Sequence, residues 1–170
     1  MIELICIGTL ITIVIIISDR KKSKKYRKKH KTPKQKGIEG ENVISNIIQY
    51  APMYKKIVRN AYIDMNENKK TEIDIIAIST KGIYVIESKN YEGWILGDEK
   101  SNQWCQNIYN KKSYFYNPIK QNQTHIKSIN KILQLDEKMY ESLIIFNKAE
   151  IKKMFVSSSR TYVMNIQKFR

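Results

Sequence analysis

The chain has 170 residues, enough for one compact domain with an appendage but not comfortably for two. It carries 31 basic and 16 acidic residues, for a net charge of +15. Its two cysteines, Cys6 and Cys105, lie in segments of different character, and no Cys/His cluster has zinc-binding spacing. The composition therefore disfavours a disulfide scaffold and a zinc protein.

The first residues, 1–18, predict a transmembrane helix. The stretch 4–17 reads LICIGTLITIVIII, and as a helix the whole segment would span roughly 27 Å, just enough to cross a bilayer. Glu3 precedes the apolar run and positive charge follows it, which is the opposite order to a cleavable signal peptide. A buried core helix is the alternative, but the basic stretch that follows directly disfavours it.

Residues 19–36 predict a basic juxtamembrane linker. Of the 31 basic residues, 11 lie between Arg20 and Lys36, so the domain expected at 37–170 is only moderately basic. Basic charge beside a membrane attracts anionic lipid, and it places the chain from Asp19 onward in the cytoplasm with the N-terminus outside. We therefore expect a single-pass protein of the cell membrane. Contact between the linker and nucleic acid is the weaker alternative.

The remaining chain alternates between helical and strand patterns. Apolar residues at helical spacing predict a helix over 38–50, which Pro52 ends. The pattern then predicts a short strand at 55–62, a polar turn at 64–70, and strong strands at 71–79 and 82–90. Both strong strands carry apolar residues on both faces, as expected for central strands that are covered on each side.

Residues 91–117 are rich in aromatic and turn residues and predict a twisted β excursion. Its aromatic residues are Tyr91, Trp94, Trp104, Tyr109, Tyr114, Phe115 and Tyr116. They could stack on bases, but we expect a small β layer to need them as its own core. A second helix is predicted from Pro118, with Asn117 as its N-cap. Strands at 142–146 and 153–158 precede a final apolar-alternating stretch.

The turn between the two strong strands brings two carboxylates together. If the loop within Ser79–Gly82 has an even number of residues, Asp74 lies opposite Glu87, whereas an odd number puts it on the other face. Facing like charges are destabilising across an antiparallel pair unless a cation lies between them. Oxygen ligands of this kind suit Mg²⁺ or Mn²⁺. Lys89 shares the face of Glu87 and could orient an attacking water and offset charge on a phosphate.

These charged residues also have plainer explanations. With Glu72 they could form a charged patch on a half-exposed sheet, but the apolar residues that precede Glu87 on its strand face disfavour this. Glu41 lies on the apolar face of the first predicted helix, where a carboxylate needs a partner. Its alternative is a first-turn glutamate favoured by the helix dipole, and both explanations remain open.

Several separated motifs follow one another along the predicted domain. They are GIEGE at 37–41, TEIDIIAISTKGIYVIESKNYEGWILG at 71–97, Trp104, and NPIKQNQTH at 117–125. In this order they resemble the nuclease-related domain, NERD, of the PD-(D/E)XK nuclease superfamily, over about 37–133. The resemblance implies an α/β, restriction-endonuclease-like core with a central mixed β-sheet flanked by helices. It also implies Mg²⁺- or Mn²⁺-dependent hydrolysis of phosphodiester bonds in nucleic acid, with DNA as the expected substrate.

The resemblance also implies the catalytic residues. Asp74 matches the family aspartate, while Glu87 and Lys89 match the E-x-K pair, although Ile73 stands where the superfamily name has proline. Glu41 matches the helical glutamate and is implied, with Asp74 and Glu87, as a metal ligand. Gln121 matches the glutamine of the helix after the sheet. The alternatives are a catalytically silent module that binds nucleic acid or anionic lipid on the same fold, and a membrane scaffold.

Overall fold

The computed structural model describes residues 32–53, 55–66 and 69–169. Residues 33–170 form one compact unit. The predicted transmembrane helix and most of the linker lie outside the described residues. Among the helices that are described, none has the length and apolar character needed to span a bilayer.

Three helices, a short 3-10 helix and nine strands are described in this unit. In chain order they are α2 (Pro33–Tyr50), β1 (Lys55–Asn66), β2 (Lys69–Ser79), β3 (Gly82–Lys89), β4 (Trp94–Asp98), β5 (Gln103–Ile108), β6 (Lys111–Tyr116), α3 (Pro118–Leu133), η1 (Glu137–Met139), β7 (Tyr140–Phe146), β8 (Glu150–Phe155), β9 (Thr161–Asn165) and α4 (Ile166–Phe169). The expected α/β class with helices flanking mixed β structure is confirmed, although the strands form two sheets.

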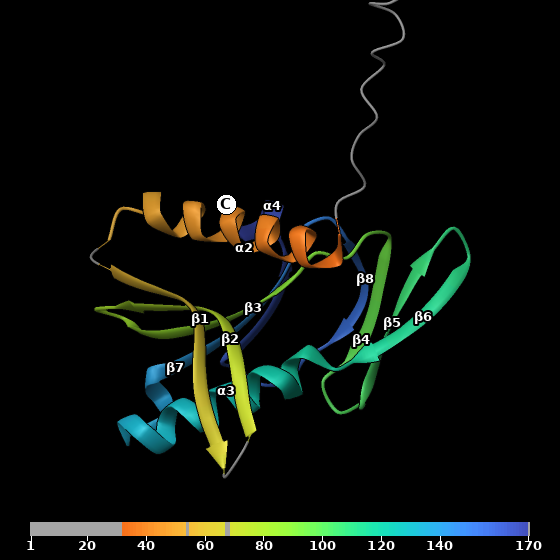
Figure 1. The fold of residues 1–170 in the computed structure, drawn as a ribbon. Helices are drawn as coiled ribbons and strands as arrows, with labels where there is room; N and C mark the ends of the chain where they lie inside the picture. Colours follow the sequence, from red (N-terminus) through yellow and green to blue (C-terminus); the bar gives the residue numbers. More distant parts are fainter. Residues whose placement is uncertain (1–31, 54, 67–68, 170) are drawn as a thin grey trace, which may run out of the picture. The chain divides into compact units, whose positions relative to one another are not determined.

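The larger sheet, sheet A, has the strand order β1-β2-β3-β7-β9. Its first three strands are antiparallel, while β7 runs parallel to β3 and β9 runs parallel to β7. Helix α2 contacts β2 and β3, and α3 contacts β3 and β7, so the sheet lies between the two helices (Figure 1). The expectation that the strong strands are covered on both faces is confirmed.

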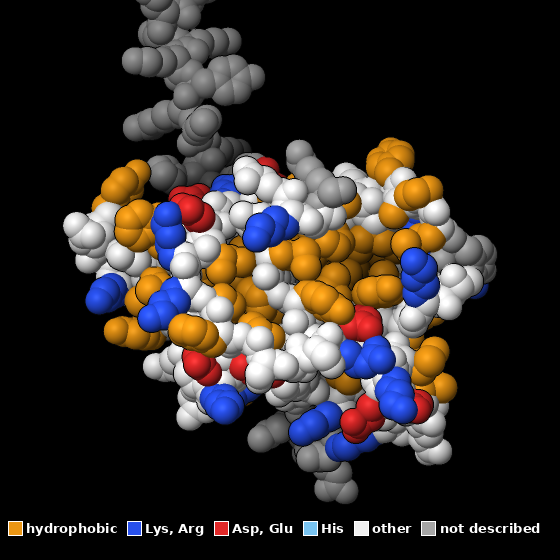
Figure 2. Space-filling model, turned by 180° about the vertical axis from the view of Figure 1, so that it is seen from behind, with side chains coloured by type: hydrophobic (Ala, Val, Ile, Leu, Met, Phe, Trp, Pro, Cys, Tyr) orange, Lys and Arg blue, Asp and Glu red, His pale blue; other side chains and the backbone are white. Residues whose placement is uncertain are grey.

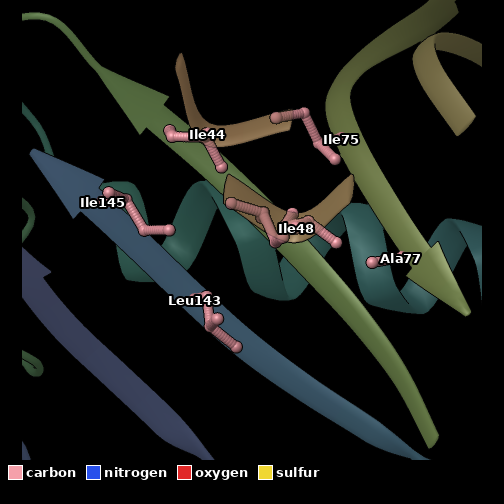
Figure 3. Close-up of a cluster of buried hydrophobic side chains, with 7 residues drawn as sticks. Ile44, Ile48, Ile75, Ala77, Leu143 and Ile145 are labelled. Carbon is pink, nitrogen blue, oxygen red and sulfur yellow. The ribbon is translucent and has the colours of Figure 1, made fainter. Parts of the chain in front are cut away.

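Apolar clusters fill both interfaces between the helices and sheet A. Under α2 the cluster consists of Ile44, Ile48, Ile75, Ala77, Ile86, Leu143 and Ile145 (Figure 3). Another, which α3 joins through Ile129, contains Ile83, Val85 and Tyr140. Each fully buried side chain of this kind contributes roughly 1.5–3 kcal/mol, so these layers hold the central strands rigidly in place.

The smaller sheet, sheet B, has the strand order β6-β5-β4-β8. Its inner face presents Ile95 and Trp104, which join Ile119, Ile144 and Phe146 in a third apolar cluster. This cluster packs sheet B against the first turn of α3 and against β7, and so fixes the position of the N-terminal end of α3.

Several boundaries differ from the sequence expectation: β7 begins at Tyr140, two residues earlier than expected, β8 spans Glu150–Phe155 and not 153–158, and two further differences have a clear physical reason. The polar turn predicted at 64–70 is too long, because β1 continues to Asn66 and β2 begins at Lys69. Opposite charges support this extension, since Asp64 faces Lys70 across the ladder and the two side chains form an ion pair at 3.6 Å. The first helix begins earlier than predicted, at Pro33, because proline is well tolerated in a first helical turn.

The aromatic residues of 91–117 divide between core and surface. Tyr91, Trp104 and Phe115 pack with Phe146, and the rings of Tyr91 and Phe115 meet edge-on with centroids 4.6 Å apart. Four others are exposed: Trp94 (47%), Tyr109 (96%), Tyr114 (66%) and Tyr116 (55%). The expectation that these aromatics form a core is therefore wrong for the exposed four. Strand alternation sends Trp94, Tyr114 and Tyr116 to the opposite side of sheet B, and Tyr109 lies in the turn between β5 and β6.

A groove of about 780 Å³ runs beside the C-terminal half of α2. Its lining is mostly apolar and comes from α2, sheet A and Phe169 of α4. Figure 2 shows hydrophobic side chains gathered in a hollow on the side of the molecule opposite to the view of Figure 1. None of the expected site residues lines this groove.

The N-cap of α3 gives a first testable prediction. The buried Asn117 side chain accepts a hydrogen bond from Ile119 N and donates to the carbonyls of Asp98, Glu99 and Ser101. We expect Asn117→Asp to lower the free energy of unfolding by about 2 kcal/mol, because it keeps the cap but turns a carboxylate toward those carbonyls. Chemical denaturation measures this. The exposed Asn102→Asp is the control, and an equal loss there would contradict the assignment.

Candidate active site

The turn between β2 and β3 sets the register of the candidate site. Ser79 pairs with Gly82, and Ile75 pairs with Ile86, so the loop has two residues and the even turn is confirmed. Gly82 has φ +138°, a conformation that L side chains rarely adopt. In this register Asp74 and Glu87 are the next facing pair, just beyond the paired stretch.

Asp74 is held through its side chain. Its Oδ2 accepts a hydrogen bond from Ser88 N at 2.8 Å. Strand β3, which carries Ser88, also pairs with β7 on the side away from β2, and in that ladder Glu87 pairs with Ile144. The carboxylate of Asp74 is thus held by β3, and β3 is itself held in place by its pairing with β7.

Glu87 projects from β3 toward α3, and only 2% of its surface is exposed. Its Oε1 lies 2.7 Å from Lys89 Nζ, and its Oε2 lies 3.2 Å from His125 Nε2. Lys89 Nζ also donates to Gln121 Oε1 at 3.1 Å. A continuous polar chain therefore joins the end of β3 to α3. The burial of Glu87 contradicts the explanation that this residue belongs to a half-exposed charged patch.

The histidine that meets Glu87 is itself held by a second contact. His125 Nδ1 lies 2.9 Å from Thr71 Oγ1 of β2. A carboxylate can only accept, so the hydrogen between His125 and Glu87 sits on Nε2, and Nδ1 is left for the Thr71 hydroxyl. Three segments of the chain thus orient one buried carboxylate.

The electrostatics of the two carboxylates differ. Burial first, and the neighbouring charge of Glu87 second, raise the pKa of Asp74 to about 7, against the hydrogen bond from Ser88 N. Burial also acts to raise the pKa of Glu87, but the hydrogen bond from His125 and the Lys89 ammonium hold it below its ordinary value. One carboxylate is therefore firmly ionised, and the other resists ionisation.

Lys89 shows the complementary effect. Burial acts to lower its pKa, but the charge and hydrogen bond of Glu87 outweigh this and raise the pKa above its ordinary value. The site therefore keeps an ammonium group beside two carboxylates in a largely buried position.

Comparison with known proteins shows the family to which the chain belongs. The model of the family NERD, nuclease-related domain, matches residues 36–147. The chain belongs to the NERD family. A relative from Bacillus anthracis, described as an uncharacterized protein, is 34% identical over 163 residues, covering 95% of this chain and 72% of its own length. A crystal structure of a protein of unknown function matches at 12% identity and a TM-score of 0.36, over 76% of this chain. This chain spans 58% of that protein's chain.

Within this NERD domain, Glu41 approaches from α2. Its Oε2 accepts from Asn60 Nδ2 at 3.1 Å and lies 3.9 Å from Arg59 Nη2. Because α2 begins at Pro33, Glu41 is not in the first turn, and the helix-dipole explanation is wrong. Its charge contributes to raising the pKa of Asp74, so the two carboxylates are electrostatically coupled.

The donor set of the NERD domain fits a hard divalent cation in part. Among the described residues, no three His, Cys, Asp or Glu side chains lie close enough together to hold a metal ion, so Glu41, Asp74 and Glu87 do not form a closed set. The fit comes from Asp74 and Glu87, two carboxylates that could act as oxygen ligands and whose mutual repulsion contributes to raising the pKa of Asp74. Cation binding would relieve that repulsion.

Sequence reasoning missed two members of this network, His125 and Thr71. No Cys or His stands at metal-binding spacing from His125 in the sequence, so the spacing alone does not assign it to the site. The available signal was its place one helical turn after Gln121, which puts both side chains on one face of α3. Thr71 carried no comparable signal.

Proposed function

We propose that this NERD domain hydrolyses phosphodiester bonds in nucleic acid with a divalent cation, Mg²⁺ or Mn²⁺, and that DNA is the substrate. The observation that supports this most directly is that the partly buried Asp74 faces the buried Glu87 beside the Lys89 ammonium. A protein gains no stability from two poorly solvated carboxylates that repel each other, whereas such a pair suits cation-assisted phosphate chemistry.

The proposed roles follow from the contacts. Asp74 and Glu87 would hold the ion, which would supply a nucleophilic water at neutral pH and offset charge on the phosphate. Lys89, positioned by Glu87 and Gln121, directs its ammonium toward the developing phosphate charge. His125 is a positioning residue that, with Thr71, fixes the orientation of Glu87. Glu41 tunes Asp74 from α2.

A cleavage assay tests this function. Labelled single-stranded DNA, duplex DNA and RNA are incubated with the full chain in Mg²⁺ or Mn²⁺. We expect Asp74→Asn and Glu87→Gln each to lower the rate at least about a hundredfold. Glu92→Gln is the matched control, since Glu92 is an exposed acid whose side chain forms an ion pair with the exposed Lys148 at 3.3 Å. Equal rates for the wild type and Asp74→Asn would reject the proposal.

One observation favours a second candidate, a catalytically silent binding module. Both oxygens of Glu87 already have partners, Lys89 and His125, so the site is satisfied in part without a cation. For such a module, binding of nucleic acid would weaken steeply with salt and would not change with Glu87→Gln. The hydrolytic function instead predicts cation-dependent loss on that substitution.

We also propose that the domain is held at the cytoplasmic face of the cell membrane. The support is the order of the apolar run at 1–18 and the basic stretch at 19–36, which also suits anionic lipid. Cell fractionation tests this, and recovery of the full chain in the soluble fraction would contradict it.

A further inference from the structure

We propose that the outer face of sheet B is a binding surface for single-stranded nucleic acid, on which bases stack against exposed aromatic rings. The inference shares with the proposed function the premise that nucleic acid is the ligand. It does not depend on hydrolysis, because it concerns a different part of the domain from the carboxylates.

Strand alternation divides the two faces of sheet B. On β6, Phe115 points into the core while Tyr114 and Tyr116 are 66% and 55% exposed. On β4, Ile95 is buried while its neighbour Trp94 is 47% exposed. Trp94, Tyr114 and Tyr116 therefore belong to regular strands, which present their rings on the side of sheet B away from the core.

Strand pairing brings these rings onto one continuous surface. Tyr114 pairs with Cys105, Cys105 with Leu96, and Leu96 with Lys153, which makes a row across all four strands. Phe155, which is 56% exposed, follows two residues after Lys153 on β8. Successive outward residues on one strand are about 7 Å apart, so a strand of nucleic acid crossing the sheet can place separate bases on separate rings.

Lysines surround the rings. Lys152 Nζ lies 4.9 Å from the ring centroid of Trp94, and Lys153 Nζ lies 5.3 Å from that of Phe155. Lys112 is exposed and shares the strand alternation of Tyr114. Figure 2 shows hydrophobic and basic side chains interspersed at the side of the molecule that carries sheet B. Aromatic faces beside ammonium groups match a ligand with alternating bases and phosphates.

The acids on this face are already engaged. Glu150 pairs with Lys152 at 2.8 Å, and Asp98 Oδ1 accepts from Lys100 N at 2.7 Å. A duplex keeps its bases stacked inside, so it could use the lysines but not the rings. A single strand uses both, and for that reason we assign the surface to single-stranded nucleic acid.

Tryptophan fluorescence gives a direct test, because the two tryptophans differ. Trp104 is 1% exposed and Trp94 is 47% exposed, so a stacking ligand will quench Trp94 selectively. The full chain, in detergent micelles and with EDTA to prevent cleavage, is titrated with an oligothymidylate of about 12 nucleotides. We expect saturable quenching that Trp94→Phe removes. Contact of the basic linker with phosphates would not produce this signal.

Variants locate the surface. Tyr114→Ala and Tyr116→Ala are each expected to weaken binding about tenfold, while Tyr116→Phe, which keeps the ring, binds as the wild type does. Tyr50→Ala is the matched control, since Tyr50 is 85% exposed but lies at the end of α2. Because the replaced side chains are exposed, the variants should remain folded, and circular dichroism checks this.

Three outcomes would overturn the inference. The first is the absence of quenching, or unchanged affinity in Tyr114→Ala. The second is equal quenching by a duplex of the same length. The third is weakened binding of the variants to phosphatidylserine vesicles with unchanged binding to the oligonucleotide, which would assign the face to lipid. Quenching without cleavage in Mg²⁺ or Mn²⁺ would support this surface and reject the proposed function, and cleavage without quenching would do the reverse.

Discussion

Asp74→Asn is expected to stabilise the folded protein at pH 8 while abolishing the proposed hydrolysis. In the wild type, burial and the charge of Glu87 raise the pKa of Asp74 from 3.8 to about 7. The folded state therefore holds this proton more tightly than the unfolded state does. The stability that it confers is fully present below about pH 4 and is lost as the pH rises through 7.

The expected size follows from the shift. Between pH 5 and pH 8 the wild type should lose about 2–3 kcal/mol of unfolding free energy through Asp74 alone, and Asp74→Asn should not. Glu87 and Lys89 do not interfere in this window. The lowered pKa of Glu87 costs stability only under more acidic conditions, and the raised pKa of Lys89 does so only under more alkaline ones.

Urea denaturation at several pH values measures this difference. Glu92→Gln is again the control, because its exposed pair should leave the pH profile of the wild type unchanged. If the unfolding free energies of the wild type and Asp74→Asn change in parallel between pH 5 and pH 8, the pKa of Asp74 is not raised in the folded state.

Lys89→Met is expected to have the largest effect on stability. It preserves the volume of the side chain but leaves the buried Glu87 without its 2.7 Å ion pair. Removing one partner of a buried pair costs about 3–5 kcal/mol, because the remaining charge stays desolvated. The proposed hydrolysis should also fall at least about a hundredfold, since the ammonium is lost.

A second substitution separates the two effects of Lys89→Met. The double variant Lys89→Met/Glu87→Gln should regain much of the lost stability, because no buried charge remains, but it should regain no cleavage. The exposed pair of Lys148 and Glu92 provides the control, and Lys148→Met should change stability by less than about 0.5 kcal/mol. A single variant as stable as the wild type, or a double variant no more stable than the single, would contradict this assignment.

The facing of Asp74 and Glu87 could be predicted from the sequence because it depends on local geometry alone. Side chains alternate with a period of two, and a two-residue turn fixes the register over the following residues. The N-cap at Asn117 could be predicted for the same reason, since a cap and a following proline are local signals.

The contacts of His125 could not be predicted, because they join residues far apart in the chain. Thr71 lies 54 residues from His125, and the contact depends on how α3 crosses sheet A. The division between Trp94 and Trp104 has a similar cause. Alternation shows that neighbouring residues on a strand face opposite ways, but the side that becomes the core depends on the packing of sheet B against β7 and α3.

The most direct test of the central claim, that Asp74 and Glu87 form a cation site, is a Mn²⁺ titration at pH 8. Electron paramagnetic resonance of free Mn²⁺ follows the binding without any substrate. The structure predicts a site in the wild type and in Glu92→Gln that is lost in Asp74→Asn and in Glu87→Gln. Equal Mn²⁺ binding by the wild type and both site variants would contradict it.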